Sequence, residues 1–220
     1  MDDLESSGEV IDQTLRELEV INRLLGGNYV TTNGLAKLLK GKSKESTVTI
    51  ADLGCGGGDI LKLIAQWADK RQLNVELIGF DANPSIIEYA KENCAAHPNV
   101  RFEVQDIFGI EFRQRKFDII CCTLFTHHFT DEQLTAIFRQ FNSQATMGTV
   151  INDLHRHWLA YYSIKLLTQL FSKSPMVKND APLSVARSFH KKDLRQILKK
   201  AGIDSHRLKW MWAFRWQLIF

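Results

Sequence analysis

The stretch that decides the fold is TVTIADLGCGGGDILKLIAQW, residues 47–67. It begins as a short β-branched and apolar run at 48–51, turns through the glycine-rich segment 52–58, and continues with apolar residues at helical spacing. Glycines lack the β-carbon that would keep a ligand away from the backbone, and they permit positive φ in the turn. The first amides of the following helix then face that ligand. The sequence therefore predicts a strand, a glycine turn and a helix, with a nucleotide-like pocket at the carboxyl end of the first strand.

The glycine spacing restricts which nucleotide can bind. The dinucleotide fingerprint G-x-G-x-x-G fails because Asp59 stands where its third glycine belongs, and the Gly-Lys-Ser/Thr of a P-loop is absent. A turn without a ligand is disfavoured, because so many glycines lower stability unless a close approach is needed. With Asp52 two residues before Gly54, the run resembles motif I of the class I S-adenosylmethionine-dependent methyltransferases.

Length and composition indicate one soluble α/β domain. A chain of 220 residues with 45% hydrophobic and 24% charged residues can bury one sizeable core. Its net charge of +3 is too small to favour a nucleic-acid partner. Four cysteines form no CxxC pair, which favours reduced thiols and a cytoplasmic location. The acidic first ten residues are unlike a secretory signal, and no apolar run is long enough to span a membrane.

Strand-like and helical segments alternate along the chain. Strands are expected at 48–51, 74–81, 100–105, 117–123 and 149–154. Helices are expected at 85–96, 131–141, 158–171 and 190–202, whereas 174–188 holds two prolines and is expected to be irregular. The alternation predicts a parallel, doubly wound sheet. Residues 203–220 predict two more strands with a turn near Ala213, and the resemblance implies a Rossmann-like, seven-stranded sheet with an antiparallel last strand.

The expected organisation is an N-terminal helical cap at 1–46 and a methyltransferase domain at 47–220, with a substrate-side insertion at 155–188. Ser6 and Glu9 are spaced as a capping box that opens an amphipathic helix, which Gly26 and Gly27 end. A second helix is expected after Thr32, ending near residue 41. The cap can pack on the core or close over a substrate, and the sequence leaves both roles open.

The resemblance also implies a set of residues for the cofactor S-adenosylmethionine and its product S-adenosylhomocysteine. The glycines would lie against the methionine part, Asp52 would orient the turn or the ammonium group, and Asp106 would accept a bond from the adenine amino group. Asp81 ends the second strand, where an acidic side chain can hold ribose hydroxyls, while Asp106 has the alternative of an ordinary turn aspartate. The expected cofactor-binding set is Asp52, Gly54, Cys55, Gly56, Gly58, Asp81, Ala82, Asp106, Ile107, Thr123 and Leu124.

Histidines follow the fourth and fifth strands, at the end of the sheet that faces the cofactor. A sulfonium methyl is already a good electrophile, so the protein has to orient the acceptor, and histidine suits a base near neutral pH. The sequence favours His155 as that base with Asp153 beside it, and His128 as a catalytic residue with a structural alternative. The histidine spacings match no zinc pattern, so no metal is expected.

The insertion at 155–188 is expected to contact the acceptor. Its aromatic residues form either a pocket wall for a flat or greasy acceptor or a core anchor for their helix: Trp158, Tyr161, Tyr162 and Phe171. The segments DLHRH and PLSVARSF resemble quinone-pathway and polyketide-associated methyltransferases. The expected substrate-binding residues are His127, Arg156, Tyr162 and Arg187.

Together these features predict an enzyme that transfers a methyl group from S-adenosylmethionine to a small aromatic, quinone-like or polyketide- or lipid-like acceptor by in-line displacement. The alternatives are an RNA or protein methyltransferase, and a non-catalytic module that binds the cofactor. The basic, aromatic segment 206–212 invites a nucleic-acid interpretation, but alternation along a strand explains it more simply. A homodimer stays open.

Overall fold

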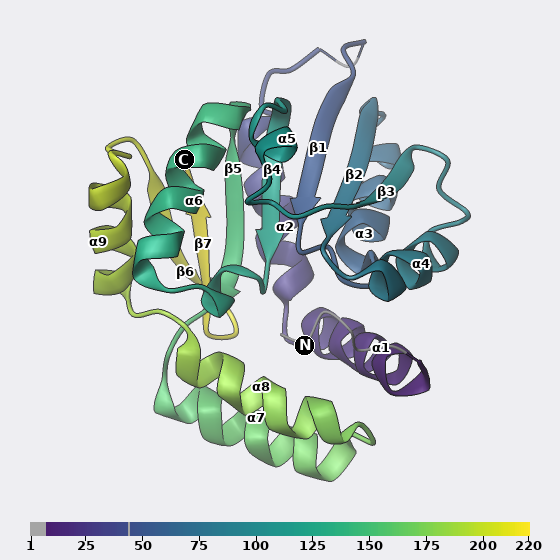
Figure 1. Cartoon of the computed structure of the whole chain (residues 1–220), viewed down its shortest axis with the longest axis vertical. Helices are drawn as coiled ribbons and strands as arrows, with labels where there is room; N and C mark the ends of the chain where they lie inside the picture. The colour runs from purple at the N-terminus through teal and green to yellow at the C-terminus, as the bar shows by residue number, and fades with distance from the viewer. Residues whose placement is uncertain (1–7, 44) are drawn as a thin grey trace.

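A seven-stranded sheet runs through the computed structural model, which describes residues 8–43 and 45–220 (Figure 1). Its strands stand in the order β3-β2-β1-β4-β5-β7-β6. The first five pair in parallel, while β7 is antiparallel to both of its neighbours, β5 and β6. This confirms the predicted fold class. The strands are β1 (Val48–Leu53), β2 (Val75–Asp81), β3 (Val100–Val104), β4 (Phe117–Thr123), β5 (Ala145–Leu154), β6 (Arg207–Met211) and β7 (Arg215–Ile219).

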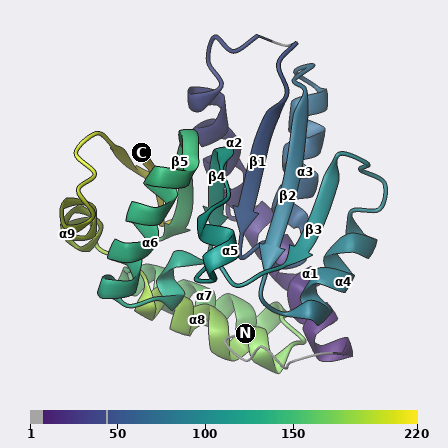
Figure 2. The ribbon, with the colours of Figure 1, turned by 45° about the horizontal axis from the view of Figure 1, so that its top comes forward.

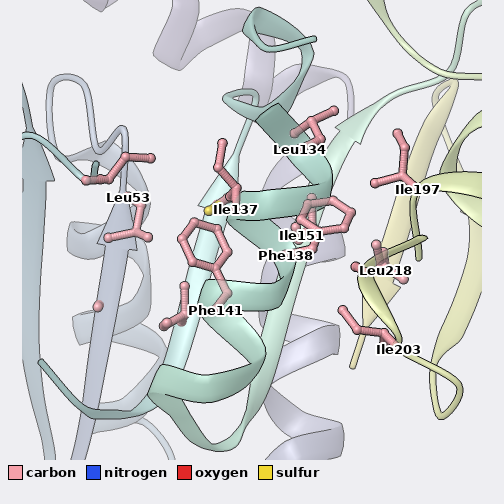
Figure 3. Close-up of a cluster of buried hydrophobic side chains, with 14 of the residues drawn as sticks. Leu53, Leu134, Ile137, Phe138, Phe141, Ile151, Ile197, Ile203 and Leu218 are labelled. Atoms are coloured by element: carbon pink, nitrogen blue, oxygen red, sulfur yellow. The ribbon is translucent and has the colours of Figure 1, made fainter. Parts of the chain in front are cut away.

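The central strands are apolar without alternation because helices cover both faces of the sheet. In β1, Ala51 and Leu53 join one buried cluster, while Val48 and Ile50 join the cluster on the opposite face. The first cluster packs under α6 (Asp131–Gln144) and α9 (Lys191–Ala201), as Figure 3 shows for the side chains around Phe138. The second packs under α2 (Gly27–Leu38) and α3 (Asp59–Asp69). The smaller α4 (Pro84–Asn93) and α5 (Ile110–Arg113) follow β2 and β3.

The N-terminal helices differ from expectation in where the second one begins. Helix α1 spans Glu9–Leu24, and Ser6 of the expected capping box lies outside the described residues. Helix α2 begins at Gly27 rather than after Thr32, because Gly26 takes a left-handed conformation (φ 73°) that turns the chain straight into it. Helix α2 packs against β5 and β7, whereas α1 lies beyond the carboxyl ends of the parallel strands (Figures 1 and 2).

The insertion folds as a helical pair, α7 (Trp158–Phe171) and α8 (Pro175–Arg187), which pack together below the sheet (Figure 2). The expectation of an irregular segment at 174–188 is therefore wrong. Pro175 occupies the first turn of α8, where proline is favoured, and the Ser174 hydroxyl caps the helix by accepting from the Val177 amide at 3.3 Å. Pro182 lies inside the helix and is buried. Among the helices described, none is long and apolar enough to cross a membrane.

Candidate functional site

A cavity of about 580 Å³ opens beside the glycine turn, at the carboxyl ends of β1, β2 and β4. A smaller one of about 100 Å³ continues past Gly54, Gly56 and Leu124, which line both. The larger cavity contains Asp81, Ala82, Asp106 and Ile107, and the smaller contains Asp52, Cys55 and Thr123. The structure thus brings the expected cofactor residues together, with the exception of Gly58. That residue caps α3 with φ 78°, and a β-carbon there would meet the Phe102 ring at 2.8 Å.

The glycine turn is shaped by its backbone conformation and by its anchor on β2. Gly54 and Gly56 have φ of 67° and 52°, a region that L side chains rarely adopt. The Gly54 and Cys55 amides both donate to the Phe80 carbonyl, at 2.9 and 3.0 Å. A β-carbon on Gly54 would stand 2.1 Å from the Phe125 ring, which lines the larger cavity. Only a residue without a side chain leaves this cavity open.

Buried carboxylates give the paired cavities an acidic character. Asp52 is 1% exposed, and its Oδ1 has no hydrogen-bond partner among the described residues. Burial and the nearby carboxylates Asp59 and Asp81 raise its pKa well above the ordinary value. Burial also raises the pKa of Asp81, although the Asn83 and Gly56 amides donate to it at 3.0 and 3.3 Å. A cationic ligand would compensate these charges, so the site fits the ammonium and sulfonium groups of S-adenosylmethionine.

Asp52→Asn should therefore stabilise the ligand-free protein and weaken its binding of S-adenosylhomocysteine. Asparagine has no charge to bury, so we expect a gain of about 0.5–2 kcal/mol in the free energy of unfolding at pH 7.5, by urea denaturation. Because burial raises the pKa of Asp52 in the folded state, the cost of burying its charge disappears as the pH falls and the carboxyl becomes protonated in both the folded and the unfolded state. The difference between variant and wild type should shrink toward pH 4. A variant that is less stable at pH 7.5 would contradict the prediction.

Asp106 has the geometry of a turn aspartate and also lines the larger cavity. Its Oδ1 accepts from the Phe108 amide at 2.9 Å, which is the geometry of a turn aspartate. The same residue lines the larger cavity beside Ile107. The turn therefore holds this side chain in place next to the cavity.

We call the cavities of about 580 and 100 Å³ the cofactor cavities. A third cavity, of about 310 Å³, adjoins them and shares Leu124 and His128 with the larger cofactor cavity. Its walls come from α1, α7, α8 and the turn between β6 and β7, and they are mostly apolar, including Ile21, Leu25 and Ile164. An outer hollow of about 510 Å³ between α1 and α7 shares these three residues. We call the third cavity the acceptor cavity, since it is the apolar space that meets the cofactor cavities.

His127 and Asp153 form a buried pair at the wall of the acceptor cavity. His127 Nδ1 lies 2.7 Å from Asp153 Oδ1, and the second carboxylate oxygen accepts from Thr126 Oγ1 at 2.6 Å and the His127 amide at 3.1 Å. Burial by itself opposes ionisation of Asp153, but His127 and these bonds outweigh it and lower its pKa to about 2. The ionised carboxylate accepts the hydrogen bond from Nδ1–H, so that in the neutral ring the lone pair lies on Nε2. That atom is buried without a hydrogen-bond partner in the described chain, and His127 lines the acceptor cavity.

His155, the base favoured by the sequence, lies outside this arrangement. It lines neither the acceptor cavity nor the cofactor cavities. Its Nδ1 accepts from the Trp210 indole at 3.2 Å, and its ring packs on Trp216. Burial and the neighbouring histidines lower its pKa. His128 lines both the acceptor cavity and the larger cofactor cavity, with its ring 4.3 Å from that of His127.

Three of the expected substrate-binding residues are also kept away from the acceptor cavity. Arg156 donates from Nε to the Ser188 carbonyl at 2.6 Å, Tyr162 is 62% exposed on the outer face of α7, and Arg187 is exposed at the end of α8. Helix α7 presents Ala160 and Ile164 to the cavity instead of its aromatic residues. Of the four aromatic residues named from the sequence, Trp158, Tyr162 and Phe171 are exposed, while Tyr161 is half-buried and packs on the cluster formed by α7 and α8.

Arg215 is a cavity residue that sequence reasoning missed. It begins β7, is 2% exposed and lines the acceptor cavity. Its Nη1 donates to Asn152 Oδ1 at 3.2 Å, and burial lowers its pKa to about 10 although Asp153 opposes this shift. The signal in the sequence was a charged residue within the largely apolar run WMWAFRWQLIF at 210–220. No group of three metal-ligating side chains occurs in residues 8–43 and 45–220.

Comparison with known proteins gives a family match over most of the chain. A family model described as "Methyltransferase domain" matches residues 44–202. The ubiquinone biosynthesis O-methyltransferase of Coxiella burnetii is 30% identical over 183 residues, which are 78% of this chain and 70% of that protein. A protein of Invertebrate iridescent virus 6 named as a methyltransferase is 39% identical over 134 residues, 53% of this chain.

A solved structure shares the fold. Human N-acetylserotonin methyltransferase in complex with S-adenosylmethionine superposes with a TM-score of 0.66 at 16% identity, over 97% of this chain and 56% of that one. The present chain also spans only 47% of the viral relative.

Proposed function

The chain belongs to the methyltransferase domain family, and from that premise we propose that it transfers a methyl group from S-adenosylmethionine to a hydroxyl oxygen of a small, largely apolar acceptor. One observation carries the proposal: His127, paired with the buried Asp153, lines the acceptor cavity, which meets the cofactor cavities at Leu124 and His128. A base at that junction is what a hydroxyl nucleophile requires.

The residues of the paired cavities would hold the cofactor. Asp52 would meet a cationic group of the cofactor with its unpartnered Oδ1, and Asp81, the last residue of β2, would hold the ribose hydroxyls. Asp106 lines the same larger cavity as Asp81. When bound, S-adenosylmethionine supplies an electrophilic methyl group on a sulfonium. The complex of the human neighbour with this cofactor supports the assignment.

His127 would take the acceptor's proton on Nε2. Asp153 stays ionised, fixes the proton on Nδ1 and stabilises the imidazolium that forms. The apolar walls around Ile21, Leu25 and Ile164 exclude water and hold an acceptor with a flat or greasy body. The quinone-pathway name of the Coxiella relative favours an aromatic ring with a hydroxyl group.

The proposal is tested with the wild-type protein in two steps. Isothermal titration should show binding of S-adenosylmethionine and S-adenosylhomocysteine. Transfer of a radiolabelled methyl group should then be detected with catechols, the simplest hydroxylated rings. Failure to bind either cofactor form would refute the methyltransferase proposal. Binding without transfer to any hydroxylated ring would favour the non-catalytic module.

A further inference from the structure

The most unusual group in the acceptor cavity is the guanidinium of Arg215. Strand β7 runs antiparallel beside β5 and pairs Arg215 with Leu154, which brings the charge to the carboxyl end of β5. Leu154 and Arg215 both line the acceptor cavity, whose walls are otherwise mostly apolar. Arg215 lines neither of the two cofactor cavities, so the carboxylate of the cofactor is not its counter-ion.

The guanidinium has donors that the protein does not use. Arginine carries five N–H donors. Within the part of the chain that the structure describes, its one hydrogen bond is from Nη1 to Asn152 Oδ1, and its buried Nε has no partner. An arginine with a purely structural role would be expected to use most of its guanidinium N–H groups in hydrogen bonds within the protein.

Asp153 is the nearest opposite charge, but its oxygens are occupied. Oδ1 receives His127 Nδ1 and the Leu154 amide, each at 2.7 Å. Oδ2 receives Thr126 Oγ1 and the His127 amide. Asp153 therefore raises the pKa of Arg215 through its charge alone, without a hydrogen bond to the guanidinium. A buried cation with unused donors is costly unless a ligand completes it.

We propose that Arg215 binds a carboxylate of the acceptor, so that the substrate is an aromatic or similarly apolar hydroxy acid rather than a neutral phenol or quinone. The planar fork of arginine matches a carboxylate. His127 and Arg215 line the same cavity of about 310 Å³, which gives an acceptor one contact for its hydroxyl and another for its carboxylate. This inference rests on the proposed function, since it names the acceptor of the same site.

The test compares 3,4-dihydroxybenzoate with its methyl ester, which differ in the negative charge. In the wild type, kcat/KM for the acid should exceed that for the ester by roughly 10- to 100-fold, as expected for a charged hydrogen-bonded pair. Arg215→Met should bring this ratio close to one, and Arg215→Lys should give an intermediate ratio because lysine lacks the fork. Arg139→Met is the matched control, since Arg139 donates to the Lys200 carbonyl on the surface; it should keep the wild-type ratio.

Binding to the protein saturated with S-adenosylhomocysteine separates this inference from methyl transfer itself. Isothermal titration should show that the wild type binds the acid at least about tenfold more tightly than the ester, and that Arg215→Met does not discriminate. That result without turnover would support the carboxylate site and count against the proposed reaction. Two results would overturn the carboxylate site. One is that the wild type turns over the acid and the ester with equal kcat/KM. The other is that the wild type binds the two compounds equally, or binds neither detectably. If Arg215→Met fails to fold, the wild-type comparison and Arg215→Lys decide.

Discussion

His127→Ala should lower kcat for a catechol acceptor by about 10²- to 10⁴-fold and leave the Kd for S-adenosylhomocysteine within about threefold of wild type. His127 lines the acceptor cavity with its Nε2 buried and unpartnered among the described residues, and it lines neither cofactor cavity. Removing it takes away the acceptor for the hydroxyl proton but no cofactor contact. Steady-state kinetics with radiolabelled cofactor and a separate titration of S-adenosylhomocysteine measure the two effects independently.

Two comparisons give this prediction its controls. His155→Ala should keep turnover within about threefold of wild type, because His155 lines none of these cavities. The double variant His127→Ala, Asp153→Asn should be about as slow as His127→Ala alone, since paired residues act as a unit. Full turnover of His127→Ala would remove His127 from the mechanism, and a loss confined to His155→Ala would make His155 the base, as the sequence favoured.

Gly54→Ala should cost about 1 to 3 kcal/mol more in the free energy of unfolding than Gly202→Ala. Both glycines have positive φ, 67° and 74°, so both substitutions carry the left-handed strain of about 1 to 2 kcal/mol. They differ in space: a β-carbon at 54 meets the Phe125 ring at 2.1 Å, while nothing lies within 4 Å of one at 202. The difference, measured by urea denaturation, isolates the clash from the strain.

Gly54→Ala should also raise the Kd for S-adenosylhomocysteine by about tenfold or more, because the methyl group and the displaced Phe125 ring enter the larger cofactor cavity. Gly202→Ala should leave that Kd at the wild-type value, since Gly202 ends α9 away from the cavities. Equal losses of stability in the two variants would mean that Phe125 yields without cost. An unchanged Kd in Gly54→Ala would remove the glycine turn from the cofactor site.

Local patterns predicted the sheet, and they predicted a set of cofactor residues that the structure gathers around two adjoining cavities, with the exception of Gly58. The β4 segment FDIICCT has an uninterrupted buried apolar run at 119–122 because both faces of the strand are covered, and that run is visible in the sequence. Two of the expected cofactor residues, Asp81 and Asp106, lie at or just after the ends of β2 and β3, so locating these strands locates them. Helix α8 was missed because Pro175 and Pro182 were read as breakers, although the first of them occupies a position that favours proline.

The acceptor side depended on contacts between distant segments. His127 and Asp153 were both candidates, but their pairing requires the relative placement of the β4 and β5 ends, which spacing in the sequence does not reveal. Arg215 was missed for a related reason. The order β5-β7-β6 places the last strand of the chain next to β5, and only that order brings the start of β7 to the cavity.

The position of α2 has a consequence for where this protein could be cut. The family match ends at residue 202 and begins at residue 44, so it leaves out both α2 and β7. Yet α2 packs tightly on the sheet: a β-carbon on Gly34 would stand 2.5 Å from Val150. Two side-chain amides of the sheet also donate to carbonyls of α2, Gln217 to Val30 at 2.6 Å and Asn152 to Gly27 at 2.9 Å. A fragment trimmed to the matched residues would expose the β5 surface and lose these bonds, and it should aggregate. The stretch that the family model matches is therefore shorter than the unit that folds.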